Sequence, residues 1–319
     1  MTRNISCLPL FTSCLSQKGG TEVNQPRKRM TFYRKQSIIF TLFAIPQTIL
    51  YVMFFIAPII GGIVYSFTDY NGISKEIHFV GLNNYKTVFS NSRFIKTVIF
   101  NFKYSALLVI CIVSLSLLLA IILNSKIKGK TFFRSMFFFP AVLPLLTMGL
   151  VFNSIITKGI PQLGATLGIE SWQISLLSRP NTAMYAILFV AIWQGLAIPT
   201  VLFLAGLQTV PEELMESASL DGATSWQKFR FITLPFLVPT LTMVFVLTLK
   251  QGLMVFDLIM SMTQGGPAGA TESMAMLIYN HGFVERRLSV AMAEALILAI
   301  LVCIVSFIQI VWSNKKRIY

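Results

Sequence analysis

Residues 104–123 read YSALLVICIVSLSLLLAIIL, a run of 20 residues without a charged side chain. An α-helix needs about 20 such residues to cross the hydrocarbon core of a bilayer. Similar runs recur along the chain, and together they predict an all-α integral membrane protein with six transmembrane helices. The six expected spans are 38–67, 104–123, 132–156, 183–207, 236–260 and 290–312.

The composition of the whole chain agrees with a membrane protein. Of its 319 residues, 55% are hydrophobic and 12% are charged, with a mean hydropathy of +0.72. A soluble domain carries roughly 25% charged residues, so this composition excludes a single soluble enzyme domain. The net charge of +14 would suit a nucleic-acid binder, but the basic residues lie in short clusters between apolar runs. We therefore expect the lipid bilayer, and no nucleic acid, as a partner.

The distribution of Lys and Arg predicts how the chain crosses the membrane. The N-terminal segment, the connections at 125–134 and 208–234 and the C-terminal tail hold 16 basic residues, whereas the alternate connections hold 9. Cytoplasmic connections carry the excess of basic residues. We therefore expect a multi-pass protein of the cell membrane, plasma or inner, with both termini in the cytoplasm. Residues 1–36 are predicted to be a disordered cytoplasmic segment and residues 37–319 a single transmembrane domain.

Residues suited to catalysis or metal binding are scarce. The four cysteines have neither the spacing of a zinc site nor the density of a disulfide scaffold. The only histidines, His78 and His281, lie far apart, and both are predicted to be in loops. We expect no catalytic residue and no metal site, because the required side chains are too few.

The connection at 208–235 contains the stretch PEELMESASLDGATSWQKFRFITLP, residues 211–235. Pro211 and the two glutamates after it suit the start of a helix. Asp221-Gly222 should end that helix, and Thr224 or Ser225 can cap a second one. Physical chemistry alone predicts two short helices at the membrane surface. They would be either a functional element or an interfacial linker that only connects two spans.

The same stretch resembles the EAA loop of binding-protein-dependent ABC importer permeases. It contains Glu216-Ser217-Ala218, then two further residues, then Asp221-Gly222-Ala223, and it ends in ITLP at 232–235, which fits the pattern I-x-L-P of that loop. Only Ser217 departs from the commonest form of the pattern. Strings at 79–85 (FVGLNNY), 256–259 (FDLI) and 263–267 (TQGGP) are similar to those of the carbohydrate branch, the maltose-permease-like proteins. With a short connection between its first two spans, this chain looks like the compact six-span form.

The resemblance implies the type I ABC importer permease fold and the role of a permease subunit in an ATP-driven importer of a sugar or oligosaccharide. The implied partners are a second homologous permease in a heterodimer, two cytoplasmic ABC ATPase subunits and an extracellular solute-binding protein. ATP hydrolysis would take place on the ATPase subunits, and the chain has no G-x-x-x-x-G-K-[ST] string, so we expect no cofactor. A permease for a non-sugar solute and a secondary transporter are the alternatives; the latter would not account for the loop.

The resemblance also assigns roles to residues of the loop, because in this family the loop docks into a cleft on the ATPase. The residues implied in ATPase coupling are Glu216, Ser217, Ala218, Asp221, Gly222, Ala223 and Phe229. Gly222 would form the bend that seats the first short helix.

Polar residues inside or near the spans are the candidates for the solute pathway, because charge is costly in a membrane and usually faces a cavity or a partner. Lys250 and Asp257 are seven residues apart and would share one helix face, with Gln251 beside them. A structural role near the membrane interface is the alternative for Asp257. Glu294 would pair with Lys250 or contact the partner permease.

Trp193-Gln194-Gly195 occupies the region that lines the sugar site in the maltose permease, so the resemblance places it in the pathway too. An indole ring suits the apolar face of a pyranose, and the amide of Gln194 suits a hydroxyl. Ordinary packing, with Gly195 allowing two helices to approach closely, is the alternative.

Overall fold

The computed structural model describes residues 27–125 and 129–315, and residues 1–26 of the predicted N-terminal segment lie outside them. The chain divides into two units, residues 1–59 and 60–319. In the first unit, α1 (Arg27–Tyr51) continues through a π-helical turn, η1 (Val52–Ile56), into the start of α2 (Ala57–Tyr65). The helical stretch Ile39–Tyr65 is long and apolar enough to cross a membrane.

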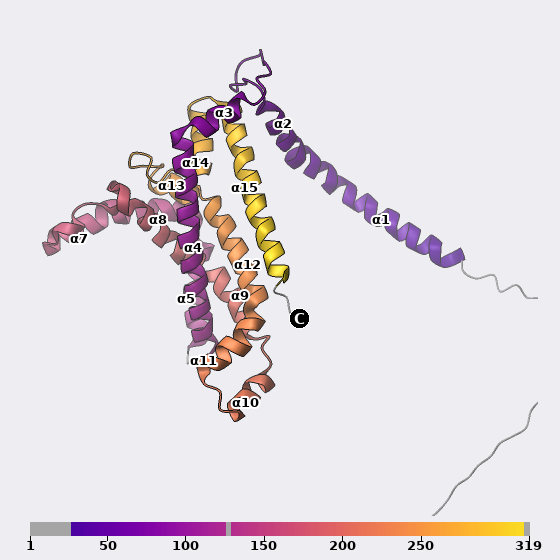
Figure 1. Ribbon diagram of the computed structural model, residues 1–319, viewed down its shortest axis with the longest axis vertical. Coiled ribbons are helices and arrows are strands. Elements are labelled where there is room, and N and C mark those ends of the chain that lie inside the picture. The colour runs from indigo at the N-terminus through magenta and orange to yellow at the C-terminus, as the bar shows by residue number, and fades with distance from the viewer. Residues whose placement is uncertain (1–26, 126–128, 316–319) are drawn as a thin grey trace, which may run out of the picture. The chain divides into compact units, whose positions relative to one another are not determined.

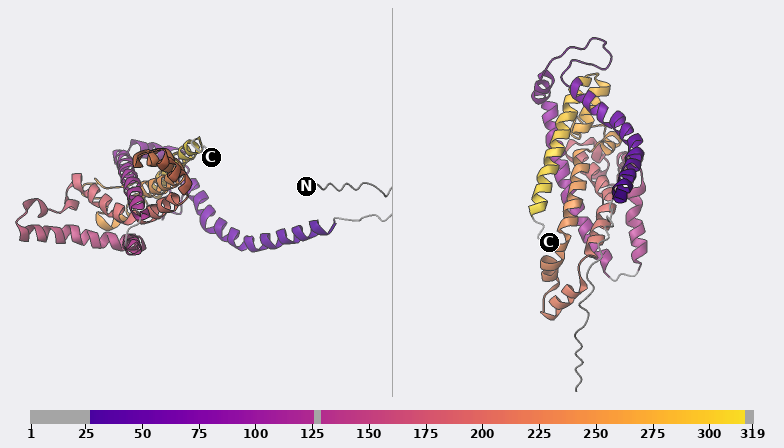
Figure 2. Two further views of the ribbon diagram at one scale, coloured as in Figure 1. Left: turned by 90° about the horizontal axis from the view of Figure 1, so that it is seen from below. Right: turned by 90° about the vertical axis from the view of Figure 1, so that its right-hand side faces the viewer.

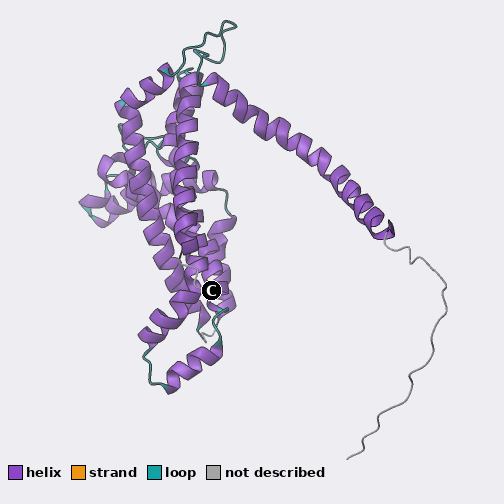
Figure 3. Ribbon diagram, turned by 45° about the vertical axis from the view of Figure 1, so that its right-hand side comes forward, coloured by secondary structure: helices purple, strands orange, loops and turns teal. Residues whose placement is uncertain are grey.

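The second unit is a bundle of helices of unequal length joined by loops (Figures 1 and 3). Its elements after α2 are α3 (Asn83–Ser90), α4 (Ser92–Asn124), α5 (Lys130–Val142), α6 (Leu145–Ser154), η2 (Ile155–Gly159), α7 (Ile160–Leu167), η3 (Glu170–Trp172), η4 (Leu176–Ser178), α8 (Pro180–Gly195), α9 (Ala197–Leu207), α10 (Glu212–Leu220), α11 (Ser225–Lys228), η5 (Phe229–Thr233), α12 (Leu234–Leu253), α13 (Asp257–Met262), α14 (Met274–Tyr279), η6 (Asn280–Val284) and α15 (Leu288–Lys315). Among the described residues no named β-strand occurs.

Within the described part of the chain, four helical stretches are long and apolar enough to cross a membrane: Ile39–Tyr65, Ser92–Asn124, Ser225–Leu253 and Leu288–Gln309. Two helix pairs pass the same test only when taken together. The pair α5 and α6–α7 is bent by 99° at its break, and the pair α8 and α9 by 45°. The described residues therefore hold up to six spans if each bent pair counts as one, and the predicted spans 132–156 and 183–207 are not single straight helices.

Proline accounts for both bends. Leu143 precedes Pro144 and has an extended backbone with ψ of 135°, as the steric bulk of a following proline favours, so α5 ends at Val142. In the second pair Pro199 lacks the N–H that would bond to the carbonyl of Gly195, and its ring crowds that carbonyl. The helix accordingly breaks between Gly195 and Ala197.

The bundle packs around α4, which contacts α8, α9 and α12. Gly252 of α12 lies so close to α4 that an added methyl group would come within 2.8 Å of the Cα of Ser105. Just beyond this contact α12 ends, and residues 254–256 are not helical before α13 begins. The predicted span 236–260 is therefore interrupted, and its freed carbonyls find other partners: Asn101 donates to Leu253 at 2.6 Å, and Ser273 donates to Val255 at 2.7 Å.

The short helices α10 and α11 lie at one end of the second unit, and α3 with the loop before it lies at the opposite end (Figures 1 and 2). The interruption between α12 and α13 lies between these two ends. The bundle thus separates three polar regions of the chain: the α10–α11 loop, the interruption, and the α3 end.

Candidate functional site

The loop between α9 and α12 folds from local signals. Glu212 and Glu213 occupy the first turn of α10, where they complement the helix dipole. After α10, Gly222 takes a positive φ of 75°; its N–H bonds to Ser219, and the N–H of Ala223 bonds back to Ala218 at 2.9 Å. This pair of bonds is a Schellman cap, in which glycine provides the left-handed residue. The predicted turn at Asp221-Gly222 is confirmed.

A capping box starts the second short helix. The side chain of Thr224 accepts from the N–H of Gln227, and the side chain of Gln227 accepts from the N–H of Thr224 at 2.7 Å. Of the two predicted caps, Thr224 is the one used. Lys228 then reaches back to α10, where its Nζ donates to the Oγ of Ser219 at 2.9 Å. The two short helices are therefore held in a fixed relation by a cap, a turn and one side-chain bond.

The outer surface of this loop is exposed. No residue of α10 is buried, Leu220 is 90% exposed, and Trp226 and Phe231 are also exposed. The carboxylates of Glu216 and Asp221 are exposed as well, and Phe229 is half-buried beside Trp226. Large exposed apolar side chains next to carboxylates are typical of a surface that another protein covers.

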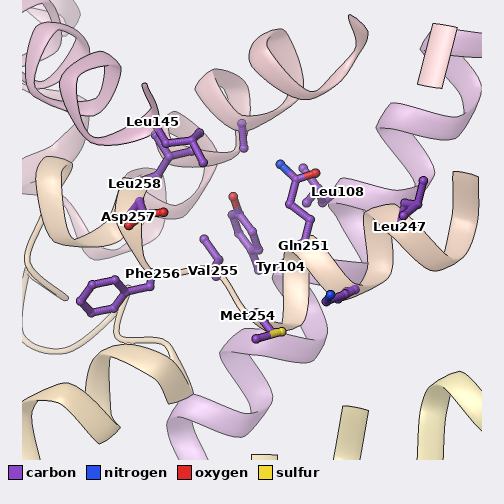
Figure 4. A pocket seen from close by; sticks show the side chains of 12 residues that line it. Tyr104, Leu108, Leu145, Leu247, Gln251, Met254, Val255, Phe256, Asp257 and Leu258 are labelled. Carbon is purple, nitrogen blue, oxygen red and sulfur yellow. The ribbon is translucent and has the colours of Figure 1, made fainter. Parts of the chain in front are cut away.

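A cavity of about 310 Å³ lies where α12 is interrupted. The side chains around it come from five helices and the interruption itself, and Figure 4 shows Tyr104 and Gln251 pointing into the space between these elements. The lining residues are Tyr104, Leu108, Leu145, Ala191, Leu247, Lys250, Gln251, Met254, Val255, Phe256, Asp257 and Leu258. This volume is at the lower end of the range for small-molecule sites.

The cavity brings together three of the predicted pathway residues, Lys250, Gln251 and Asp257. The reason differs from the prediction, because the helix that was expected to align Lys250 with Asp257 ends between them. Lys250 is near the end of α12 and Asp257 is in the first turn of α13. They do not form a salt bridge within the described chain, so both charges are available at the cavity wall.

The remaining predicted pathway residues lie at different distances from this cavity. A methyl group added to Gly195 would lie 3.8 Å from the amide of Gln251, so the break between α8 and α9 borders the cavity. Trp193 packs edge-on against Phe152 at 5.4 Å between ring centroids, the contact expected for ordinary packing. Gln194 is half-buried and is not part of the lining.

Glu294 has a different partner from the predicted one. It is 1% exposed on α15, and both of its carboxylate oxygens lie 2.9 Å from the Nδ1 of His281. The pairing with Lys250 is therefore wrong, and so is the prediction that His281 lies in a loop, because His281 is buried in η6. A buried carboxylate needs such a partner, but the sequence offers no periodic signal that connects residues 281 and 294.

This pair belongs to a network that we call the charged clasp: Arg93, Glu272, Asn280, His281, Glu285 and Glu294. Arg93 donates to both carboxylate oxygens of Glu272 and to Glu285, each at 2.7 Å. Asn280 donates to Glu272 at 2.8 Å, and the Nε2 of His281 lies 3.6 Å from Glu285. The clasp ties the start of α4, the loop before α14, η6 and α15 together at the α3 end.

The electrostatics of the clasp are visible at Glu285, which lies outside the apolar stretches. Partial burial by itself would raise the pKa of Glu285, but the hydrogen bond from Arg93 and the nearby positive charges outweigh it and lower the pKa below its ordinary value of 4.5. Glu285 is therefore ionised and bonded at neutral pH. Among residues 27–125 and 129–315, no group of three His, Cys, Asp or Glu side chains is placed to hold a metal ion.

Comparisons with known proteins agree with this architecture. Residues 112–319 match the family described as "Binding-protein-dependent transport system inner membrane component". The chain is 44% identical over 276 residues to the "Multiple sugar-binding transport system permease protein MsmF" of Streptococcus mutans, covering 86% of this chain and 95% of the relative. It is 30% identical over 291 residues to the "sn-glycerol-3-phosphate transport system permease protein UgpA" of Agrobacterium fabrum, covering 89% and 99%.

A solved structure is similar in fold. The chain superposes with a TM-score of 0.77 on a chain of a bacterial ABC transporter involved in the import of the acidic polysaccharide alginate, covering 90% of this chain and 99% of that one at 20% identity. The two chains therefore share a fold.

Proposed function

Because the chain belongs to the family of binding-protein-dependent transport system inner membrane components, we propose that it is the permease subunit of an ATP-driven importer of a sugar or oligosaccharide. The observation that carries the choice of solute is the similarity to a sugar permease over most of both chains. In this proposal the chain forms half of the translocation pathway, beside a second, homologous permease, and residues 37–319 act as one transmembrane domain. An extracellular solute-binding protein delivers the solute, and two ATPase subunits drive transport.

The loop between α9 and α12 is the surface we propose for the ATPase. This loop has a fixed turn, and its carboxylates, Leu220 and Trp226 are exposed. These properties suit a rigid protrusion that enters a cleft of another protein. Glu216 and Asp221 would meet the ATPase, and Ser217, Ala218, Ala223 and Phe229 would hold the protrusion in shape. The loop and both chain termini then face the cytoplasm, and the charged clasp faces the outside, in agreement with the excess of basic residues in the cytoplasmic set.

The cavity at the interruption of α12 is the proposed solute site of this subunit. Broken helices whose ends line a cavity are where membrane proteins place exposed polar backbone and polar side chains. Lys250, Gln251 and Asp257 supply a donor, an amide and an acceptor there. Trp193, Gln194 and Gly195 lie on the helix beside it, and Glu294 acts in the clasp instead of the pathway.

An anionic solute is the second candidate, because one relative is named for the transport of sn-glycerol-3-phosphate. A phosphate would pair with Lys250 but would be repelled by Asp257 in the same small cavity. Uptake assays that use a neutral trisaccharide and glycerol phosphate side by side, in proteoliposomes with the cognate binding protein and ATP, separate the two. Uptake that needs an ion gradient and no ATP would instead indicate a secondary transporter.

The role of the loop is tested by Gly222→Val. No atom lies within 4 Å of a methyl group built on Gly222, so the substitution strains the positive φ without a clash, at a cost of about 1 to 3 kcal/mol. We expect an inserted permease that assembles poorly with its ATPase, or whose ATPase no longer responds to the binding protein, with transport lost.

Two matched variants control for strain alone. Gly168 ends α7 with a φ of 70° and equally open surroundings, so Gly168→Val carries the same backbone strain outside the loop and should keep coupling. Gly222→Asn should keep coupling as well, because asparagine tolerates the left-handed region. Parental ATP hydrolysis and uptake by Gly222→Val would refute the assigned role.

A further inference from the structure

Tyr104 also lines the cavity. Unlike Lys250 and Asp257, it carries no charge, so nothing in the sequence singles it out as a functional residue. It is the first residue of the apolar run 104–123, on α4, and is 1% exposed. Its ring stacks on Phe100 at 5.8 Å between centroids and belongs to the main hydrophobic core. The ring alone would explain a phenylalanine at this position.

The hydroxyl of Tyr104 is what packing does not explain. Within the described chain it makes no hydrogen bond, whereas Asn101, one turn earlier on the same helix, uses both ends of its amide, to Leu253 and to Met274. In the described chain the side-chain oxygens that are fully buried without a partner are those of Ser105 and Gln309, so the Tyr104 hydroxyl is not enclosed in the core but borders the cavity. Figure 4 shows this hydroxyl pointing into the cavity, toward the space between Gln251 and Asp257.

We propose that the Tyr104 hydroxyl is a specificity-determining hydrogen-bond partner of the transported solute, and that this solute is a neutral polyhydroxy compound. The inference rests on the proposed function, since it assigns a contact within the proposed solute site. A phenol both donates and accepts, as does the amide of Gln251, and Asp257 accepts. Sugar hydroxyls also donate and accept, so each can pair with this set, and the presence of one cation and one anion, Lys250 and Asp257, disfavours a solute of either net charge.

The core of the test is Tyr104→Phe, which removes one oxygen and keeps the ring on Phe100. The full transporter, with its second permease, ATPase and binding protein, is reconstituted in proteoliposomes. Uptake of radiolabelled maltotriose, arabinotriose and trehalose is measured first with the parent protein. For the sugar that the parent imports, we expect uptake by Tyr104→Phe at saturating binding protein to fall about threefold to tenfold, the effect of one neutral hydrogen bond. ATP hydrolysis stimulated by the binding protein should persist, so more ATP is spent per sugar.

Tyr185→Phe is the matched control, because Tyr185 is 51% exposed and does not line the cavity; its uptake should equal that of the parent. A second measurement uses the parent protein alone, with monodeoxy analogues of the imported sugar at concentrations that saturate the binding protein. The parent should import one of these analogues as slowly as Tyr104→Phe imports the complete sugar. Tyr104→Phe itself should import that analogue and the complete sugar at equal rates.

The outcomes separate the two levels of the proposal. If the parent imports a sugar and both Tyr104→Phe and every deoxy analogue match its rate, the role of Tyr104 is overturned while the proposed function stands. If the parent imports none of the sugars but imports glycerol phosphate, the proposed function fails, and the assignment of a neutral solute to Tyr104 fails with it.

Discussion

The charged clasp and the cavity at the interrupted α12 both contain ionisable side chains within the helical bundle, but they use them in opposite ways. In the clasp, Arg93 bonds to two carboxylates and Glu294 bonds to His281 through both oxygens. In the cavity, Lys250 and Asp257 face the same space without an ion pair, and the Tyr104 hydroxyl has no partner among the described residues. Charged side chains that are paired with one another hold elements together, whereas unpaired polar groups at a cavity are available to a ligand.

This difference in pairing distinguishes polar residues that stabilise a membrane protein from those that are candidates for function. Glu294 and Lys250 look alike in the sequence, as single charges within apolar stretches, and both are candidates for a pathway on that basis. The structure separates them by their partners and not by their burial alone. Changes in the clasp should therefore reduce stability, and changes in the cavity should reduce transport.

Glu294→Leu should give the largest effect. It removes the partner of the Nδ1 of the buried His281, and breaking a buried pair costs about 3 to 5 kcal/mol. We expect a large drop in the melting temperature of the purified protein in detergent and a lower yield of the assembled complex. The double variant His281→Leu/Glu294→Leu removes both partners and should recover part of the loss; equal melting temperatures for Glu294→Leu and the parent would contradict the assigned pairing.

Lys250→Ala and Gln251→Ala should give an effect of intermediate size, on a different property. Both side chains are exposed to the cavity, so the melting temperature should change little. Uptake should fall several-fold, because one hydrogen bond to a solute is worth about 1 kcal/mol and one to a charged group somewhat more. The measurement is uptake at limiting substrate together with the melting temperature; normal uptake by either variant would remove that residue from the solute site.

Acid should weaken the clasp through Glu285, with the smallest effect of the three. Its pKa is lowered in the folded protein, so its contribution to stability is present above the ordinary value of 4.5 and is lost as the pH falls through the lowered pKa. Its side chain is partly exposed, so the contribution is small. Melting temperatures of the parent and Glu285→Gln should differ at pH 6 and converge in acid; curves that stay parallel down to pH 3 would show that Glu285 contributes nothing.

The parts of the fold that were predictable from the sequence are those specified by neighbours in the chain. The turn at Gly222 and the cap at Thr224 follow from residue types that satisfy backbone groups within five residues. The apolar runs likewise predict helices, because length and hydropathy are local properties. Local chemistry therefore predicted the loop almost completely.

The parts that were not predictable depend on partners far along the chain. Nothing near residue 254 ends α12; the interruption is stabilised by Asn101 and Ser273, which bond to its freed carbonyls. The helix spacing used for Lys250 and Asp257 therefore failed, although the two residues do line one cavity. Tyr104 was missed because it reads as one more apolar residue in a span, and His281 because its partner lies on another helix.

The most direct test of the account is the accessibility of position 251 in the assembled transporter. Gln251→Cys is made in a protein whose four natural cysteines are replaced, with Ile198→Cys, which does not line the cavity, as the control. If the cavity is the solute path and the α10–α11 loop couples it to the ATPase, an impermeant thiol reagent should label position 251 from the cytoplasmic side without nucleotide. With ATP bound and hydrolysis blocked, it should label position 251 from the outside, and position 198 should show no such switch. Labelling of position 251 from the same side in both states, or from neither, would contradict the account.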